Sequence, residues 1–112
     1  MKVAFVSGPY RADTISQTVQ NIRIAESVAQ ELWQLGWCAL CPHLNTALFD
    51  GLCDDSVWLK GDLELLRRSD ALVRLPKWRN STGAVAEHDL ARELGLEVYQ
   101  WRADRGDRLE AV

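Results

Sequence analysis

The stretch that decides the fold of this chain is ALVRLP at residues 71–76, followed four residues later by STGAVAE at residues 81–87. The first part is an apolar run with the length of a buried strand. The second part opens a helical pattern of apolar residues that continues to Gly95. A buried strand that leads through a short loop into an amphipathic helix is the repeating unit of parallel α/β sheets. This stretch therefore predicts an α/β fold, with the start of the helix at the sheet edge where such folds bind ligands.

The rest of the chain repeats this alternation. Apolar runs of strand length occupy residues 2–7, 37–41 and 97–101, and helical patterns occupy residues 14–35 and 54–69. Strands that alternate with helices lie parallel and are joined by right-handed crossovers. We therefore predict a small doubly wound parallel sheet of about four strands in the order 2-1-3-4, with helices on both faces and a crevice between the first and third strands.

Composition and charge narrow the class of protein. Hydrophobic residues make up 47% of the 112 positions, so residues 1–102 are predicted to form one domain and residues 103–112 a charged, loosely held tail. The formal net charge of −3 argues against a nucleic-acid polymer as a partner. No apolar run reaches the length of a membrane span, and residues 2–7 are a first strand rather than a signal peptide. We expect a cytoplasmic protein that acts away from membranes.

The cysteines do not predict a metal site. Cys38 and Cys41 have the CxxC spacing, with His43 and Cys53 downstream. In a strand over residues 37–41 the two thiols point to opposite faces, and no second CxxC or HxxxH pair completes a ligand set. We expect free thiols, no metal and no cofactor.

Most candidate binding residues lie in three loops, 7–13, 42–53 and 76–83, which converge at the carboxyl edge of a parallel sheet. A glycine allows a ligand to approach closely, an arginine offers a fork for phosphate or carboxylate, and a helix start binds anions. Tryptophans can stack on a planar ligand or fill a subunit interface. The alternative is that these are turn, cap and surface residues, with a structural histidine. The candidates are Gly8, Tyr10, Arg11, His43, Asn45, Trp58, Trp78, Ser81, Thr82 and Gly83.

Two carboxylates are candidates for chemistry. On a helical wheel Glu87 falls inside the apolar arc, roughly 20° from Leu94, and a carboxylate on a core face is costly unless it is paired or used. Asp62 lies at the edge of the apolar stripe of its own helix. The alternatives are a glutamate favoured by the positive end of the helix dipole and an aspartate on a helix surface beside Lys60.

Three motifs occur in order along the chain. They are Ser7-Gly8-Pro9-Tyr10, then Gly61-Asp62-Leu63 through Asp70-Ala71-Leu72-Val73, and then Ser81-x-Gly83-x-x-x-Glu87. Over about residues 1–100 the chain resembles the nucleoside 2-deoxyribosyltransferase superfamily, and the run PHLNT at residues 42–46 is similar to that of short phage and bacterial members. The resemblance implies a flavodoxin-like fold, a small nucleoside or nucleotide as substrate, and homodimers or larger homo-oligomers with sites near subunit interfaces.

The resemblance also implies roles for three residues. Glu87 would be the nucleophile on the anomeric carbon of the sugar. Asp62 would donate a proton to the nucleobase or hold the sugar, and Tyr10 would hydrogen-bond Glu87 and help to keep it ionised. Two carboxylates about 5 Å apart are what retaining glycosyl transfer uses.

One position bears on the substrate. Family members that act on free deoxynucleosides often carry an aspartate where this chain has Ser81, whereas relatives that hydrolyse nucleoside 5′-monophosphates carry a serine there. Gly8, Arg11 and Gly83 complete the pattern of those hydrolases. We therefore predict hydrolysis of the N-glycosidic bond of a nucleoside 5′-monophosphate through a glutamyl-glycosyl intermediate. The alternatives are a base-exchanging 2-deoxyribosyltransferase, a non-catalytic nucleotide-binding module, and an interaction protein that uses its tryptophans.

Overall fold

A five-stranded sheet in the order β2-β1-β3-β4-β5 forms the centre of the computed structural model, which describes residues 1–112. The first four strands in this row are parallel, as in the predicted order 2-1-3-4. Phe5 of β1 stands in register with Leu40 of β2 on one side and with Leu72 of β3 on the other. The strands are β1 (Val3–Ser7), β2 (Cys38–Leu40), β3 (Ala71–Arg74), β4 (Glu97–Trp101) and β5 (Leu109–Ala111).

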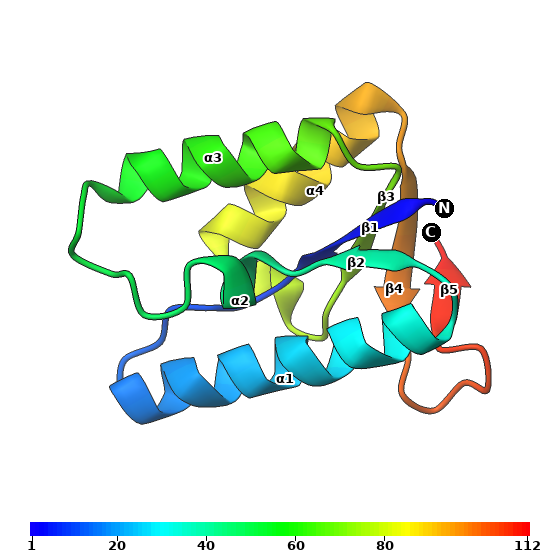
Figure 1. Ribbon diagram of the computed structural model, residues 1–112, viewed down its shortest axis with the longest axis horizontal. Coiled ribbons are helices and arrows are strands. Elements are labelled where there is room, and N and C mark those ends of the chain that lie inside the picture. Colours follow the sequence, from blue (N-terminus) through cyan, green and yellow to red (C-terminus); the bar gives the residue numbers. More distant parts are fainter.

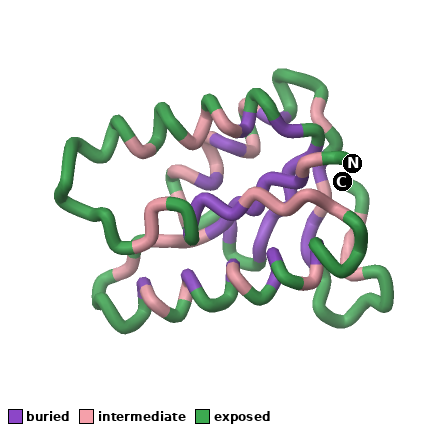
Figure 2. Tube along the Cα trace, in the orientation of Figure 1, coloured by how far each residue is buried: buried purple, intermediate pink, exposed green.

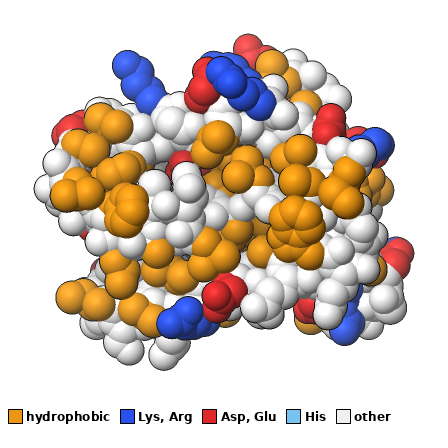
Figure 3. Space-filling view, in the orientation of Figure 1, with side chains coloured by type: hydrophobic (Ala, Val, Ile, Leu, Met, Phe, Trp, Pro, Cys, Tyr) orange, Lys and Arg blue, Asp and Glu red, His pale blue; other side chains and the backbone are white.

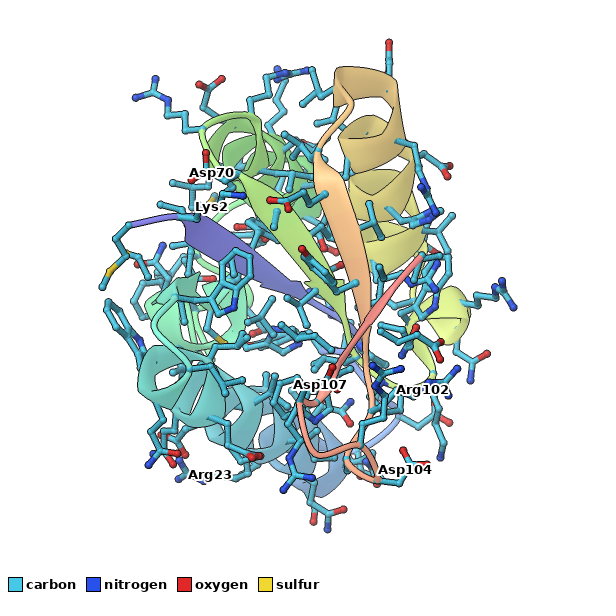
Figure 4. The ribbon with its side chains drawn as sticks, turned by 90° about the vertical axis from the view of Figure 1, so that its right-hand side faces the viewer. Lys2, Arg23, Asp70, Arg102, Asp104 and Asp107 are labelled. Atoms are coloured by element: carbon cyan, nitrogen blue, oxygen red, sulfur yellow. The ribbon has the colours of Figure 1, made fainter.

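The strand β5 lies in the segment predicted to be a loosely held tail, and that expectation is wrong for its last residues. β5 pairs antiparallel with β4, with Trp101 opposite Leu109 (Figure 4). Arg108 in the preceding loop forms an ion pair with Glu31 on the long first helix. β5 has only three residues and follows the charged segment 102–108, so the sequence gives no clear strand signal there. Its pairing comes entirely from β4.

Helices cover both faces of the sheet (Figure 1). α1 (Ile15–Gln34) lies on one face, and α3 (Asp55–Arg67) and α4 (Thr82–Leu94) lie together on the other. Two shorter elements occupy loops, α2 (Pro42–Asn45) and the 3₁₀ turn η1 (Trp78–Asn80). α2 falls within residues 42–53, which the sequence analysis predicted as loop. None of the helices combines the length and hydropathy that crossing a bilayer requires.

Local signals account for the ends of α1. The hydroxyl of Thr14 accepts a hydrogen bond from the backbone N–H of Gln17 at 3.1 Å and so caps the helix at the residue where the helical pattern of the sequence begins. Gly36 follows the helix with φ of 94°, a conformation that glycine adopts without strain. Ile15, in the first turn of α1, is 80% exposed because this end of the helix extends beyond the sheet (Figure 2).

Two hydrophobic cores lie on either side of the sheet. Val6 packs toward α1 with Leu32, and the preceding Phe5 packs toward α3 and α4 with Leu66 and Ala91. Successive residues of one strand thus enter different cores, which is why the strands are apolar throughout rather than alternating. The carboxyl ends of β1 and β3 meet the start of α4, where the structure is hollowed.

Candidate active site

A cleft of about 650 Å³ opens at the carboxyl ends of β1 and β3. The loop after β1, the segment between β2 and α3, and the start of α4 all line it, as the predicted convergence of loops requires. The cleft contains nine of the predicted site residues and Trp58. These are Gly8, Tyr10, Arg11, His43, Asp62, Ser81, Thr82, Gly83 and Glu87.

Glu87 points into the interior at the floor of this cleft. Its side chain projects from α4, and the residue is 8% exposed, in agreement with its position in the apolar arc. The hydroxyl of Ser7, at the end of β1, donates a hydrogen bond to Oε1 of Glu87 at 2.6 Å. The pKa of Glu87 is raised to about 8: burial is the main cause, the Ser7 hydrogen bond lowers the pKa, and the nearby charge of Asp62 raises it.

Asp62 lines the same cleft from α3. Burial raises the pKa of Asp62 to about 6. Because the charge of Asp62 acts on Glu87, the two acids titrate as a pair, and this pair carries one proton at neutral pH. The sequence places Glu87 inside the apolar arc of its helix and Asp62 at the edge of the apolar stripe of its own, and the packing of α3 against α4 brings both acids to one cleft.

Tyr10 does not make the predicted hydrogen bond to Glu87. Its hydroxyl donates to Oδ1 of Asp50 at 2.7 Å and accepts from the backbone N–H of Leu48 at 2.8 Å. These bonds tie the loop after β1 to the segment that precedes α3, so the tyrosine hydroxyl is directed to the cleft mouth. The residue that contacts the buried glutamate is Ser7, which the sequence analysis quoted only as part of a motif.

Arg11 is already paired within the chain. Its guanidinium forms hydrogen-bonded ion pairs with both oxygens of Asp55, at 2.6 and 3.0 Å, and a longer one with Asp50 at 3.3 Å. Asp50 and Asp55 both line the cleft, and neither was a predicted site residue. Their sequence signal is weak because an aspartate just before a helix normally indicates an N-cap. In the structure Asp54 is the N-cap of α3, and Asp50 and Asp55 bind Arg11 instead.

The start of α4 presents free donors to the cleft. The hydroxyl of Ser81 caps the helix by accepting from the N–H of Ala84 at 3.2 Å. The backbone N–H groups of Thr82 and Gly83 have no partner in the chain, and both residues line the cleft. A 13-residue helix whose first N–H groups face a cavity offers an anion site at that end.

Gly8 serves packing. A Cβ atom at this position would lie 2.6 Å from Cβ of Leu75, so a side chain cannot be accommodated without displacing Leu75, the residue that follows β3. The glycine therefore lets the loop after β1 pass close to β3, which places the backbone of residues 8–11 along the cleft.

His43 has the structural role that the sequence analysis held open. Its Nε2 donates to the backbone carbonyl of Pro9 at 2.8 Å, and burial lowers the pKa of the ring. The neutral ring packs edge-on against Tyr10, with centroids 5.8 Å apart. His43 therefore braces the loop that forms one wall of the cleft.

Two predicted site residues lie outside the cleft. Asn45 lines a neighbouring hollow of about 480 Å³ between α2 and α3, which Trp58 and Asp62 also line. Trp78 is buried against His88 and under the guanidinium of Arg74, 4.6 Å from its ring centroid. Of the two tryptophans predicted near the loops, only Trp58 reaches the cleft.

Exposed apolar side chains gather beside the cleft mouth. Figure 3 shows orange side chains at the left of the molecule, over the segment that leads into α3, and further ones along its middle. The homo-oligomer implied by the resemblance stays a prediction, and this apolar surface is its candidate subunit interface. The exposed members, from α2 through the first turn of α3, are Leu44, Leu48, Phe49, Leu52 and Val57.

The chemistry of the cleft is that of acids and hydrogen-bond donors. No group of three or more histidine, cysteine, aspartate or glutamate side chains lies together in a way that could hold a metal ion. Cys38, Cys41 and Cys53 are free thiols. The arrangement can supply a carboxylate nucleophile, a carboxylic acid and an anion-binding helix start.

The fold is that of the 2-deoxyribosyltransferases. A 2-deoxyribosyltransferase from Bacillus psychrosaccharolyticus superposes with a TM-score of 0.63 at 19% identity, over 88% of this chain and 70% of that protein. One from Leishmania mexicana superposes with a TM-score of 0.61 at 15% identity, over 100% of this chain and 79% of that protein. No curated protein sequence matches the chain. Residues 10–100 match the DUF4406 family, a domain of unknown function, and the chain belongs to this family.

Proposed function

We propose that this protein cleaves the N-glycosidic bond of a nucleoside 5′-monophosphate, with Glu87 as nucleophile and Asp62 as proton donor. The observation that carries the proposal is the pair of acids in one cleft, whose pKa values are raised to about 8 and about 6. Two titratable groups with shifted and unequal pKa values in a cavity are typical of acid–base assignments in enzymes. The fold shared with 2-deoxyribosyltransferases agrees with a glycosyl-transferring reaction.

The reaction proceeds by two displacements. An oxygen of ionised Glu87 attacks C1′ of the sugar, the bond from C1′ to the base nitrogen breaks, and its electron pair leaves with the base. Asp62 donates its proton to the departing base. A water molecule then attacks C1′, gives a proton to Asp62, and releases Glu87 as a carboxylate. The pair begins and ends with one proton. Because the pKa of Glu87 is raised further than that of Asp62, this proton lies mainly on Glu87 at neutral pH, and the reactive form is the minor one in which Asp62 holds it.

The cleft suits a ligand of this size and polarity. Its volume of about 650 Å³ lies within the range of roughly 300–1,000 Å³ common for small-molecule sites. The free N–H groups of Thr82 and Gly83, beside the Ser81 hydroxyl, would receive the 5′-phosphate at the positive end of α4. Tyr10 and Arg11 would close the opposite rim, and Trp58 offers an aromatic ring to the base.

A second candidate is base exchange on a free nucleoside. Asp50 and Asp55 already neutralise Arg11, and their charges disfavour a phosphate at that rim of the cleft. A nucleoside without a phosphate meets no such repulsion. In this reaction a second base replaces water in resolving the glycosyl-enzyme ester.

One experiment separates these functions. The protein is incubated with a panel of nucleosides, 2′-deoxynucleosides and their 5′-monophosphates, with and without a second base, and free base and new nucleoside are separated by chromatography. Hydrolysis of monophosphates alone supports the first candidate, and exchange on unphosphorylated substrates supports the second. Glu87→Gln should abolish either activity, whereas Glu93→Gln, an exposed glutamate on the same helix, should leave it unchanged.

A binding module without catalysis gives a different result. Ligand would raise the melting temperature of the wild-type protein and of Glu87→Gln alike, and no base would appear. That outcome would remove the enzymatic proposal.

A further inference from the structure

We infer that Ser7 is the positioning residue for the proposed nucleophile, a task that the family resemblance had assigned to Tyr10. The inference rests on the function proposed above. Ser7 Oγ lies 2.6 Å from Oε1 of Glu87, and Ser7 and Glu87 are 1% and 8% exposed. The Tyr10 hydroxyl instead donates to Asp50, at the mouth of the cleft.

The backbone holds Ser7 in place. It is the last residue of β1, stands in register with Arg74 of β3, and its carbonyl accepts a hydrogen bond from the N–H of Leu75 at 2.8 Å. The hydroxyl therefore projects from the carboxyl end of a strand that is flanked by β2 and β3, so no loop movement is needed to bring it to Glu87. A donor fixed in this way costs little reorganisation when charge on its partner changes.

The hydrogen bond selects which oxygen reacts. Oε1 accepts from Ser7, and Oε2 makes no hydrogen bond within the chain. Glu87 lines the cleft, so the free oxygen is the one available to the anomeric carbon. In the ester formed by Oε2, Oε1 becomes the carbonyl oxygen, and Ser7 donates to it throughout both displacements.

The same hydrogen bond favours the ionised glutamate. A hydroxyl that donates to a carboxylate stabilises its charged form, and among the groups acting on Glu87 only Ser7 lowers its pKa. Removing the donor should therefore leave a smaller fraction of the enzyme with a reactive carboxylate at neutral pH. The effect should fall on kcat, because Ser7 is buried beneath Glu87 and is not among the residues lining the cleft.

The test compares Ser7→Ala with Tyr10→Phe, each of which removes one hydroxyl. The ionisation of Glu87 is followed through the ¹³C shift of its side-chain carboxyl across pH, with the signal assigned by Glu87→Gln. We expect the midpoint in Ser7→Ala to move to higher pH than in wild type and the midpoint in Tyr10→Phe to stay in place. We also expect kcat of Ser7→Ala to fall by about ten- to a hundredfold with KM nearly unchanged, the loss of a hydrogen bond to a charged group.

An unchanged midpoint in Ser7→Ala, or an equal shift in Tyr10→Phe, overturns the inference even where the wild-type protein releases base. A shifted midpoint in a protein that releases no base overturns the proposed function instead and leaves the control of Glu87 ionisation by Ser7 standing. The two failures are thus distinguishable. Circular dichroism of both variants identifies a folding defect, and the alanine is expected to fold because it is smaller than serine and suits the buried end of β1.

Discussion

Replacing Glu87 with glutamine should stabilise the protein, and increasingly so as the pH rises. The folded protein holds the Glu87 proton more tightly than the unfolded chain does, because burial raises its pKa from 4.5 to about 8. The wild-type protein therefore has its full stability from this group below pH 4.5 and loses it as the pH rises to 8. Glutamine does not titrate, so the variant keeps at high pH the stability that the wild-type protein loses.

The pKa shift sets the size of this effect. A difference of 3.5 pKa units, from 4.5 to about 8, corresponds to about 5 kcal/mol in the free energy of unfolding at about 1.36 kcal/mol per unit. At pH 7 the wild-type protein has already lost about 3 kcal/mol of this unfolding free energy. Domains of this size are stable by about 5–15 kcal/mol, so the change is large. Ser7 can donate to the amide oxygen of glutamine as it does to Oε1 of the acid.

Urea unfolding followed by tryptophan fluorescence measures this prediction directly. The chain has five tryptophans, and the unfolding free energy of each variant is taken at intervals from pH 5 to pH 9. The quantity of interest is the difference between Glu87→Gln and wild type at each pH, since groups common to both proteins cancel. Glu93→Gln serves as the matched control, because Glu93 is exposed on the same helix and its side chain makes no hydrogen bond. A difference that stays constant from pH 5 to pH 9 would refute the buried, protonated Glu87.

Three further predictions follow from the same geometry. Base release should have a bell-shaped pH dependence of kcat/KM with limbs near the two pKa values of about 6 and about 8, and a flat profile would contradict the shared proton. Gly8→Ala should destabilise the protein by about 1–3 kcal/mol, because the added methyl group clashes with Leu75. Gly61→Ala, in open space on α3, should stabilise it by about 0.5–1 kcal/mol. Equal urea midpoints for the two variants would contradict the close contact between Gly8 and Leu75. Asp55→Asn should remove the shorter of the two ion pairs of Arg11, leave the one with Asp50, and strengthen binding of a nucleoside 5′-monophosphate several-fold in calorimetry. This effect should disappear at high salt.

The alternation of strands and helices was readable from the sequence because its signals are local. The hydrophobic runs and the cap at Thr14 each depend on residues within one element. The inward orientation of Glu87 was readable for the same reason, since the period of a single helix determines it. β5 was missed because three residues beside a charged loop carry no periodic signal, and their pairing depends on β4.

The partners of the polar side chains could not be read in this way. Tyr10 contacts Asp50, 40 positions away and before α3, and Arg11 contacts Asp55, 44 positions away at the start of α3. Ser7 donates to a glutamate 80 positions away. Sequence spacing says nothing about such distances. The resemblance implied Tyr10 as the hydrogen-bond partner of Glu87, whereas in the structure the partner is Ser7, at the end of β1.

What the sequence by itself determined is the class of fold and the edge of the sheet at which polar residues collect, because both follow from hydrophobic periodicity. Only the tertiary structure decided that Glu87 and Asp62 share one cleft, that Ser7 holds Glu87, and that Arg11 is neutralised. Each of these depends on how α3, α4 and the loops pack against the sheet. Burial and charge then act through space on whichever groups that packing brings together.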